Sequence, residues 1–321
     1  MKKFITSKFQ IALDVVISLL IVAALLHFAG FEEFIDQLAS IDLFWLTASI
    51  VLLLGMYLMM AFRINILLKE MGSPLPLVSI FKAHLTGMLL SDITPARSGY
   101  LSTALVMHRN YKVSSEKAMV SILGPQAYDF IFKILVGGIA LLFLIEYAMI
   151  ENGWVMLAGV AGLSFVLLVM LLLMYSRRFL NFFSFSESWP FVGKMYSMFH
   201  RVQDHSGVVI KKTPILLALL IFTWALKALS WYAVAKALHI TLSIQYPEEV
   251  FYFFFQPLVT MLEFVPTPTL AGLGFSEAGG VLVMSLFGVT AAQATAFMLV
   301  ARLKSTLVNL PGIEEALKLI K

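Results

Sequence analysis

The chain has 321 residues, of which 60% are hydrophobic and only 13% are charged, and its net charge is +4. Soluble domains carry about one quarter charged residues, so this composition excludes that class and indicates a polytopic membrane protein. The absence of cysteine excludes disulfides, thiolate metal sites and a catalytic thiol. Because the basic residues are spread along the chain rather than gathered in one patch, we expect no nucleic-acid partner.

About six helices that cross the membrane are predicted, in an all-α fold. The first follows a basic start, but its apolar run contains Asp14 and lacks the small-residue cleavage site of a signal peptide, so we expect it to be retained. The runs at 43–62 and 154–175 carry no charge and reach the roughly 20 residues that a helix needs to cross a bilayer. The full set of predicted ranges is 9–29, 43–66, 117–145, 153–176, 214–238 and 290–312.

Two further apolar regions, 77–109 and 249–288, are interrupted by proline and glycine. Backbone groups inside a bilayer must be hydrogen-bonded within the protein, so broken segments survive there only where they are buried or line a cavity. We therefore predict two re-entrant helical hairpins. The residues expected to shape their turns are Pro95 and Gly99 in the first, and Pro266, Pro268, Gly272 and Gly274 in the second.

Lysine and arginine are distributed unevenly among the connections. They are absent from 30–42, 146–153 and 239–289, whereas several occur in each of 1–8, 63–117, 177–212 and 303–321. Cytoplasmic loops collect basic residues. Both termini are therefore predicted in the cytoplasm, in a protein integral to the cytoplasmic membrane. The first hairpin then enters from the inner side and the second from the outer side.

These positions predict an inverted repeat. Two crossing helices, a hairpin and a third helix occur twice with opposite orientation, which is the plan of many transporters. A short sequence similarity between the two halves supports the repeat, because VSSEKA and VTAAQA each follow a predicted hairpin and stand at the start of a predicted helix. The predicted parts are a first repeat at 1–146, a second repeat at 153–312 with a cytoplasmic connector at 177–212, and a cytoplasmic tail at 313–321.

Charged side chains inside a membrane each cost roughly 2.5–3.5 kcal/mol and therefore mark candidate sites. At the tip of the first hairpin, Arg97 offers a fork of donors suited to a phosphate. An Asp92–Arg97 pair that only stabilises the turn is the alternative. In the second hairpin, Glu263 and Glu277 are expected to face a polar cavity, and capping of the following helix is an equal alternative for Glu277.

Asp129 and Arg302 complete the predicted substrate-binding set. Asp129 shares a helix face with Lys133, and its depth in the span favours a cavity-facing role over simple neutralisation by that lysine. Arg302 needs a counter-ion, which we expect to be Glu263, Glu277 or a lipid phosphate.

Three other ionisable residues are weaker candidates. Lys304 is expected to reach the cytoplasmic interface. Asp14 and Lys227 lie at membrane depth and would suit a pair across helices. The sequence contains no Walker loop, HExxH motif or recognisable Ser-His-Asp context, and its six histidines show no metal-ligand spacing. We therefore expect no metal, no cofactor and no enzymatic activity.

Two segments carry a resemblance to a known family. ITPARSGYLSTALVMHRNYKVSSEKA is similar to a pattern of P-x-R-x-G-E followed by a basic loop and an alanine-rich helix. PTPTLAGLGFSEAGGVLVMSLFGVTAAQATAFMLVARL is similar to P-x-x-x-G-x-G-x-x-E, then G-V-x-x-x-x-A, then R. Both patterns are typical of the lysylphosphatidylglycerol synthase transmembrane-region family, a flippase-like membrane domain.

The resemblance covers about 11–312, and the chain looks like a stand-alone member without the aminoacyltransferase domain. The positions that fall on family motifs are Arg97, Gly99, Asp129, Gly272, Gly274, Glu277 and Arg302. Two places depart from the pattern. Tyr100 stands where the family has Glu, and Pro125 with Gln126 replaces Glu-Arg before Asp129.

The resemblance implies a lipid translocase that moves a phospholipid or a polyprenyl-phosphate-linked lipid between leaflets. Three alternatives stay open: a membrane-embedded lipid transferase, a small-solute transporter, and a scaffold for a separate lipid-modifying enzyme. The expected partners are a lipid substrate, the membrane and, for the scaffold, that cytoplasmic enzyme.

Overall fold

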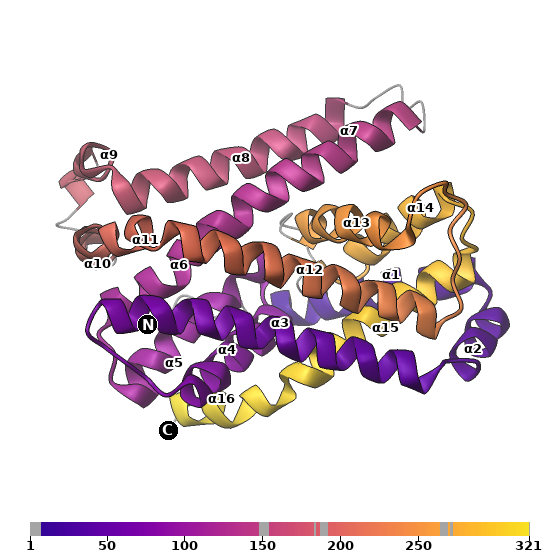
Figure 1. Cartoon of the computed structure of the whole chain (residues 1–321), viewed down its shortest axis with the longest axis horizontal. Coiled ribbons are helices and arrows are strands. Elements are labelled where there is room, and N and C mark those ends of the chain that lie inside the picture. Colours follow the sequence, from indigo (N-terminus) through magenta and orange to yellow (C-terminus); the bar gives the residue numbers. More distant parts are fainter. Residues whose placement is uncertain are drawn as a thin grey trace. The chain divides into compact units, whose positions relative to one another are not determined.

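The computed structural model describes residues 8–147, 154–182, 184–186, 192–263, 269 and 272–320, and every regular element in this part of the chain is a helix (Figure 1). The all-α prediction is therefore confirmed. The elements are α1 (Lys8–Ala29), α2 (Phe31–Ala39), α3 (Leu43–Glu70), α4 (Leu77–Ser91), η1 (Pro95–Leu101), α5 (Ser102–Tyr111), α6 (Ser115–Phe132), η2 (Lys133–Gly137), α7 (Gly138–Tyr147), α8 (Trp154–Tyr175), α9 (Arg177–Phe182), η3 (Ser184–Ser186), α10 (Val192–His205), α11 (Gly207–Lys211), α12 (Thr213–Ala237), α13 (Glu248–Glu263), α14 (Phe275–Leu286), α15 (Ala291–Asn309), η5 (Leu310–Gly312) and α16 (Ile313–Ile320).

Each of the six ranges predicted to cross the membrane contains a helix. Within the described residues, three helical stretches are long and apolar enough to cross a bilayer, namely Leu43–Glu70, Ser115–Leu144 and Thr213–Ala237. Leu13–Ala29 and Phe31–Ala39 add a fourth if this pair, bent by 87°, is one span. The chain is therefore an integral membrane protein, and six crossings stay a prediction.

Both regions broken by proline and glycine consist of short helices. The first contains α4, the 3-10 helix η1 and α5, and the second contains α13 and α14. The first break has a local cause, because a residue that precedes proline is disfavoured in the α conformation, and Thr94 precedes Pro95. Pro266 and Pro268 lie outside the described residues.

The chain forms two compact units, and each draws on both halves of the sequence. Unit 1 comprises Met1–Met56, Met88–Tyr100 and Trp224–Leu310. Unit 2 comprises Tyr57–Gly87, Leu101–Thr223 and Pro311–Lys321. Unit 1 therefore contains the tip of the first broken region together with the whole of the second.

Unit 1 is held together by packing around α15, which contacts α1, α2 and α14. Aromatic side chains fix α12 and α13 to the same helix. The ring centroid of Trp231 lies 5.5 Å from that of Phe297 and 5.6 Å from that of Phe255, and the Tyr252 ring lies 5.7 Å from Phe297. Such pairs contribute about 0.5–1.5 kcal/mol each beyond their burial, so this layer sets the relative positions of the helices that carry the site.

Unit 2 is organised around α6, which packs against α5, α8, α10 and α11 (Figure 1). The helix continues through Pro125 and passes into the π-helix η2 at Lys133. Proline lacks the backbone N–H that a helix uses for hydrogen bonding, and a π-helical turn departs from the regular α-helical hydrogen-bond pattern. The helix is therefore irregular at Pro125 and again from Lys133. The C-terminal helix α16 packs on α5 in the same unit.

Candidate functional site

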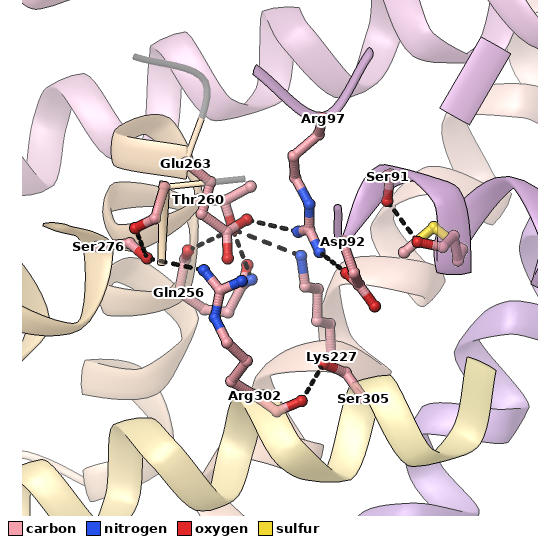
Figure 2. A network of polar contacts seen from close by, with 12 residues as sticks. Ser91, Asp92, Arg97, Lys227, Gln256, Thr260, Glu263, Ser276, Arg302 and Ser305 are labelled. Carbon is pink, nitrogen blue, oxygen red and sulfur yellow. Dashed lines mark hydrogen bonds and ion pairs between the residues drawn. The ribbon is translucent and has the colours of Figure 1, made fainter. Parts of the chain in front are cut away.

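Charged and polar side chains from η1 and the turn before it, and from α12, α13, α14 and α15, gather in unit 1 (Figure 2). We call this set the polar cluster. It comprises Asp92, Arg97, Lys227, Gln256, Thr260, Glu263, Ser276, Glu277 and Arg302. Its three cations and three carboxylates balance each other. A balanced set suits a low-dielectric environment, where an unpaired charge is costly.

Arg97 joins the two broken regions. Its Nη2 donates to Asp92 Oδ1 at 2.7 Å, and its Nη1 donates to Glu263 Oε2 at 2.5 Å. The Arg97 side chain is only 16% exposed. The Asp92 contact is the pair that was the alternative interpretation of Arg97, whereas the Glu263 contact connects the turn to the end of α13. The same guanidinium therefore holds a local and a distant carboxylate.

The backbone around Arg97 is constrained by the sequence at the tip. Arg97 has a φ of 53°, a left-handed conformation that costs an L-residue roughly 1–2 kcal/mol. The N–H of Gly99 donates to Thr94 Oγ1 at 2.7 Å, and a Cβ on Gly99 would overlap the Leu90 carbonyl group. Only glycine allows this close approach, and the turn it permits aims Arg97 at its partners.

Other contacts hold the two carboxylates that Arg97 binds. Asn309 Nδ2 of α15 donates to Asp92 Oδ2 at 2.9 Å. Gly272, with a φ of +74°, lies so close to α13 that a Cβ there would be 3.3 Å from the Cα of Glu263. The predicted turn residue Gly272 therefore supports the position of Glu263.

Arg302 of α15 binds Glu277, one of the three counter-ions expected for it. Its Nε donates to Glu277 Oε1 at 2.5 Å, and its Nη2 donates to Ser276 Oγ at 3.3 Å. The other oxygen of Glu277 accepts a hydrogen bond from the N–H of Gly274 at 2.6 Å. Glu277 thus caps the start of α14, which was the alternative weighed for it, and also pairs with Arg302.

Five members of the cluster were not among the predicted site residues: Asp92 and Ser276, which are described above, and Lys227, Gln256 and Thr260. Lys227 Nζ lies 3.5 Å from Thr260 Oγ1 and 4.7 Å from the Trp224 ring centroid, and Gln256 Nε2 donates to Thr260 Oγ1 at 2.7 Å. Figure 2 shows Arg97, Lys227 and Arg302 all directing their cationic ends toward this part of α13. The sequence could have indicated Gln256 and Thr260, because they follow helical spacing with Glu263. These three positions form one polar face of an aromatic-rich helix.

Asp129 lies in unit 2, where Arg63 binds it. Arg63 Nη1 and Nη2 donate to the two carboxylate oxygens at 3.2 and 3.1 Å, and Nη2 also donates to the Pro125 carbonyl at 2.8 Å. Counting Arg63 among the basic residues of a cytoplasmic connection was wrong. The helix α3 continues to Glu70, which leaves the Arg63 side chain inside the fold and only 1% exposed.

The expectation that Lys304 reaches the interface was also wrong. Lys304 is 5% exposed, and its Nζ donates to Ser230 Oγ on α12 at 2.7 Å. The side of α15 that carries Lys304 packs against α12, so the side chain is buried within the fold and does not extend to the interface. Of the predicted turn residues, Pro95 opens η1 and Gly99 lies within it, while Gly272 and Gly274 precede α14.

The arrangement suits recognition of an anion. Each arginine of the cluster is held by carboxylates through charge-assisted hydrogen bonds, and a phosphate presents the same kind of anionic oxygen pair as a carboxylate. A phosphate can therefore replace a carboxylate on either guanidinium without leaving the cation unpaired.

The model of one protein family, described as "Lysylphosphatidylglycerol synthase TM region", matches residues 11–312 of the 321. This match includes every residue of the polar cluster. No curated protein matches the chain.

Proposed function

The chain belongs to the lysylphosphatidylglycerol synthase transmembrane-region family, and from this premise we propose that it is a lipid translocase. It moves a phospholipid or a polyprenyl-phosphate-linked lipid between the leaflets of the cytoplasmic membrane. The observation that carries the proposal is the polar cluster, where Arg97 and Arg302 are each held by a carboxylate that a lipid phosphate can replace.

The order of helices supports the inverted repeat that we propose for this function. Two long helices, α1 and α3, precede a broken pair and the long stretch that begins with α6; then α8 and α12 precede a second broken pair and α15. The distribution of lysine and arginine gives the two runs opposite orientation, with six crossings, two re-entrant hairpins and both termini in the cytoplasm.

The chemistry follows from the cost of a charge in hydrocarbon. A translocase must shield the headgroup while the acyl chains remain in the bilayer. A lipid phosphate that binds Arg97 displaces Glu263, and one that binds Arg302 displaces Glu277, so both arginines keep an anionic partner throughout. Lys227 Nζ lies 3.5 Å from Thr260 Oγ1, on the face of α13 that carries Glu263, so the released carboxylate of Glu263 stays beside a cation.

The test is a fluorescent-lipid translocation assay in proteoliposomes, performed beside a thermal unfolding measurement. Arg302→Lys keeps the charge but loses the fork of donors that binds a phosphate with two parallel hydrogen bonds. We expect it to lower the translocation rate at least about tenfold, which corresponds to about 1.4 kcal/mol, with little change in the unfolding temperature. Arg302→Ala leaves the buried Glu277 without its partner and should lower both.

Arg177→Lys is the matched control, since Arg177 pairs with Asp204 at an exposed position where the side chain is 64% accessible. It should translocate lipid at the rate of the unmodified protein. Normal translocation by Arg302→Lys, or an Arg302→Ala protein unchanged in both measurements, would contradict the proposed role of the cluster.

A further inference from the structure

Lys304 is a buried amine in unit 1 that lies outside the polar cluster. It follows Arg302 by two residues on α15, so a helical repeat directs the two side chains to different faces. Lys304 Nζ donates to Ser230 Oγ at 2.7 Å and lies 3.3 Å from the Ser230 carbonyl oxygen. The Ser230 hydroxyl in turn donates to the Ser49 carbonyl at 2.7 Å. These contacts connect α15, α12 and α3.

The number of donors and acceptors at this position fits an uncharged amine. The Ser230 hydroxyl has one hydrogen, which it gives to Ser49, so it accepts from Lys304. A neutral amine has two N–H donors, and the two oxygens of Ser230 accept both. An ammonium would have a third donor to satisfy and a charge to bury without a carboxylate, which is the costlier state.

No carboxylate forms an ion pair with Lys304 in the part of the chain that the structure describes. Glu277 of α14 binds Arg302, Glu263 of α13 binds Arg97, and Lys236 of α12 binds Glu248. Asp92, which accepts from Asn309 of α15, binds Arg97. The remaining charged or titratable groups on the elements around α15 are Lys8, buried Asp14 and exposed His27 on α1, exposed Glu32, Glu33 and Asp36 on α2, Lys227 and Tyr232 on α12, and exposed Glu249 and buried Tyr252 on α13.

We propose that Lys304 is a proton-binding site that couples lipid movement to proton movement. The inference rests on the translocase function proposed above. Binding of a lipid phosphodiester adds one negative charge to the balanced polar cluster. One proton from water, taken up by the lone pair of the Lys304 amine to form an ammonium, offsets the added charge. When the lipid leaves, the ammonium loses that proton, and no other bond is made or broken.

The decisive measurement is proton uptake by the purified protein on lipid binding, followed with a pH indicator in weakly buffered detergent. The probe is phosphatidylglycerol, whose phosphodiester carries one net negative charge, and phosphatidylcholine, which has no net charge, is the comparison. Unmodified protein should take up about one proton for each phosphatidylglycerol bound and none for phosphatidylcholine.

Lys304→Met tests the residue itself, because methionine is similarly long and unbranched but cannot bind a proton. This variant should still bind phosphatidylglycerol, without proton uptake. In proteoliposomes, a pH gradient should no longer change its translocation rate. Lys236→Met removes a lysine that pairs with Glu248 at the end of α12, and it should retain both the uptake and the response to the gradient.

The outcomes separate the two proposals. Lipid binding and translocation by unmodified protein without proton uptake, or equal uptake by Lys304→Met, would overturn proton coupling and leave the translocase intact. Because the comparison of the two lipids uses unmodified protein, it decides the question even if Lys304→Met does not fold. Failure of unmodified protein to bind or translocate either lipid would overturn the translocase function, and the coupling with it.

Discussion

At the scale of single residues, the site depends on a glycine that brings one segment of backbone against another. The N–H of Gly99 donates a hydrogen bond to Thr94 Oγ1 across the turn in which Arg97 adopts its left-handed conformation. The direction of the Arg97 side chain is therefore fixed by the turn as well as by its carboxylate partners. A residue that never contacts a ligand thus decides where a phosphate-binding group points.

Gly99→Ala should destabilise the protein by about 1–3 kcal/mol, because the added Cβ meets the Leu90 carbonyl and the backbone must shift. The measurement is the unfolding temperature in detergent together with the translocation rate, both of which should fall. Gly138→Ala is the matched control, since no atom beyond its chain neighbours and the adjoining backbone of its own helix lies within 4 Å of its Cβ position. The control should be neutral or gain up to about 1 kcal/mol. Equal behaviour of the two variants would contradict the proposed constraint.

The buried pair of Arg63 and Asp129 gives a second prediction at this scale. Asp129→Leu removes the carboxylate and leaves the Arg63 charge buried, so the free energy of unfolding should fall by about 3–5 kcal/mol. The double variant Arg63→Met with Asp129→Leu should lose much less, because no charge is then left unpaired. Denaturant titration in detergent measures both. Additive losses in the double variant would show that the pair is not coupled.

At the scale of elements, the Glu315 carboxylate is one of the groups that attach α16 to α5, through Asn110, and Lys318 of α16 binds the same carboxylate. Asn110 Nδ2 and Lys318 Nζ donate to it at 2.7 and 2.6 Å, and the side chain is 2% exposed. Burial raises the pKa of the Glu315 carboxyl, but the hydrogen bonds from Lys318, Asn110 and Tyr111 lower it by more, so its pKa lies below the usual 4.5. The attachment therefore depends on the ionised form.

A carboxyl group with a lowered pKa in the folded state stabilises that state above its unfolded pKa, and this contribution is lost as the pH falls through the folded value. The protection factors of the α16 amides, which correct for the pH dependence of intrinsic hydrogen exchange, should therefore be high at neutral pH and decrease once the pH falls below the usual 4.5 of a glutamate. Glu315→Gln should exchange faster at neutral pH and show a weaker pH dependence. Glu314→Gln, at a side chain that is 56% exposed, should behave like unmodified protein. An unchanged profile in Glu315→Gln would refute the assignment.

At the scale of the whole molecule, the proposed orientation predicts which residues face each side of the membrane. Because the chain has no cysteine, single cysteines can be introduced without background labelling. With a membrane-impermeant maleimide, Asp36→Cys should react from the outer side, whereas Ser98→Cys and Lys211→Cys should react from the cytoplasmic side. Ser98 and Asp36 are both exposed. Labelling of Ser98→Cys from the outer side alone would show that the inverted arrangement is wrong.

Two properties of the protein could be read from the sequence because they are local. Long apolar runs and proline breaks depend on neighbouring residues, so the six helix ranges and both broken regions were found close to their observed bounds. Charged residues are costly in an apolar chain, which singled out Arg97, Glu263, Glu277 and Arg302 before any contact was known. The short helix α2 was missed, since its nine residues carry no long apolar run.

The pairing of these charges was decided by tertiary structure. Sequence separation does not show that Arg97 contacts Glu263, 166 residues away, or which of several carboxylates Arg302 selects. Lys304 was expected at the interface and Arg63 in a cytoplasmic connection, whereas packing against α12 and α6 buries their side chains. The physical reason is that a helix pattern fixes the spacing of side chains along one axis, whereas the rotation of each helix against its neighbours decides which side chains meet and which lose contact with water.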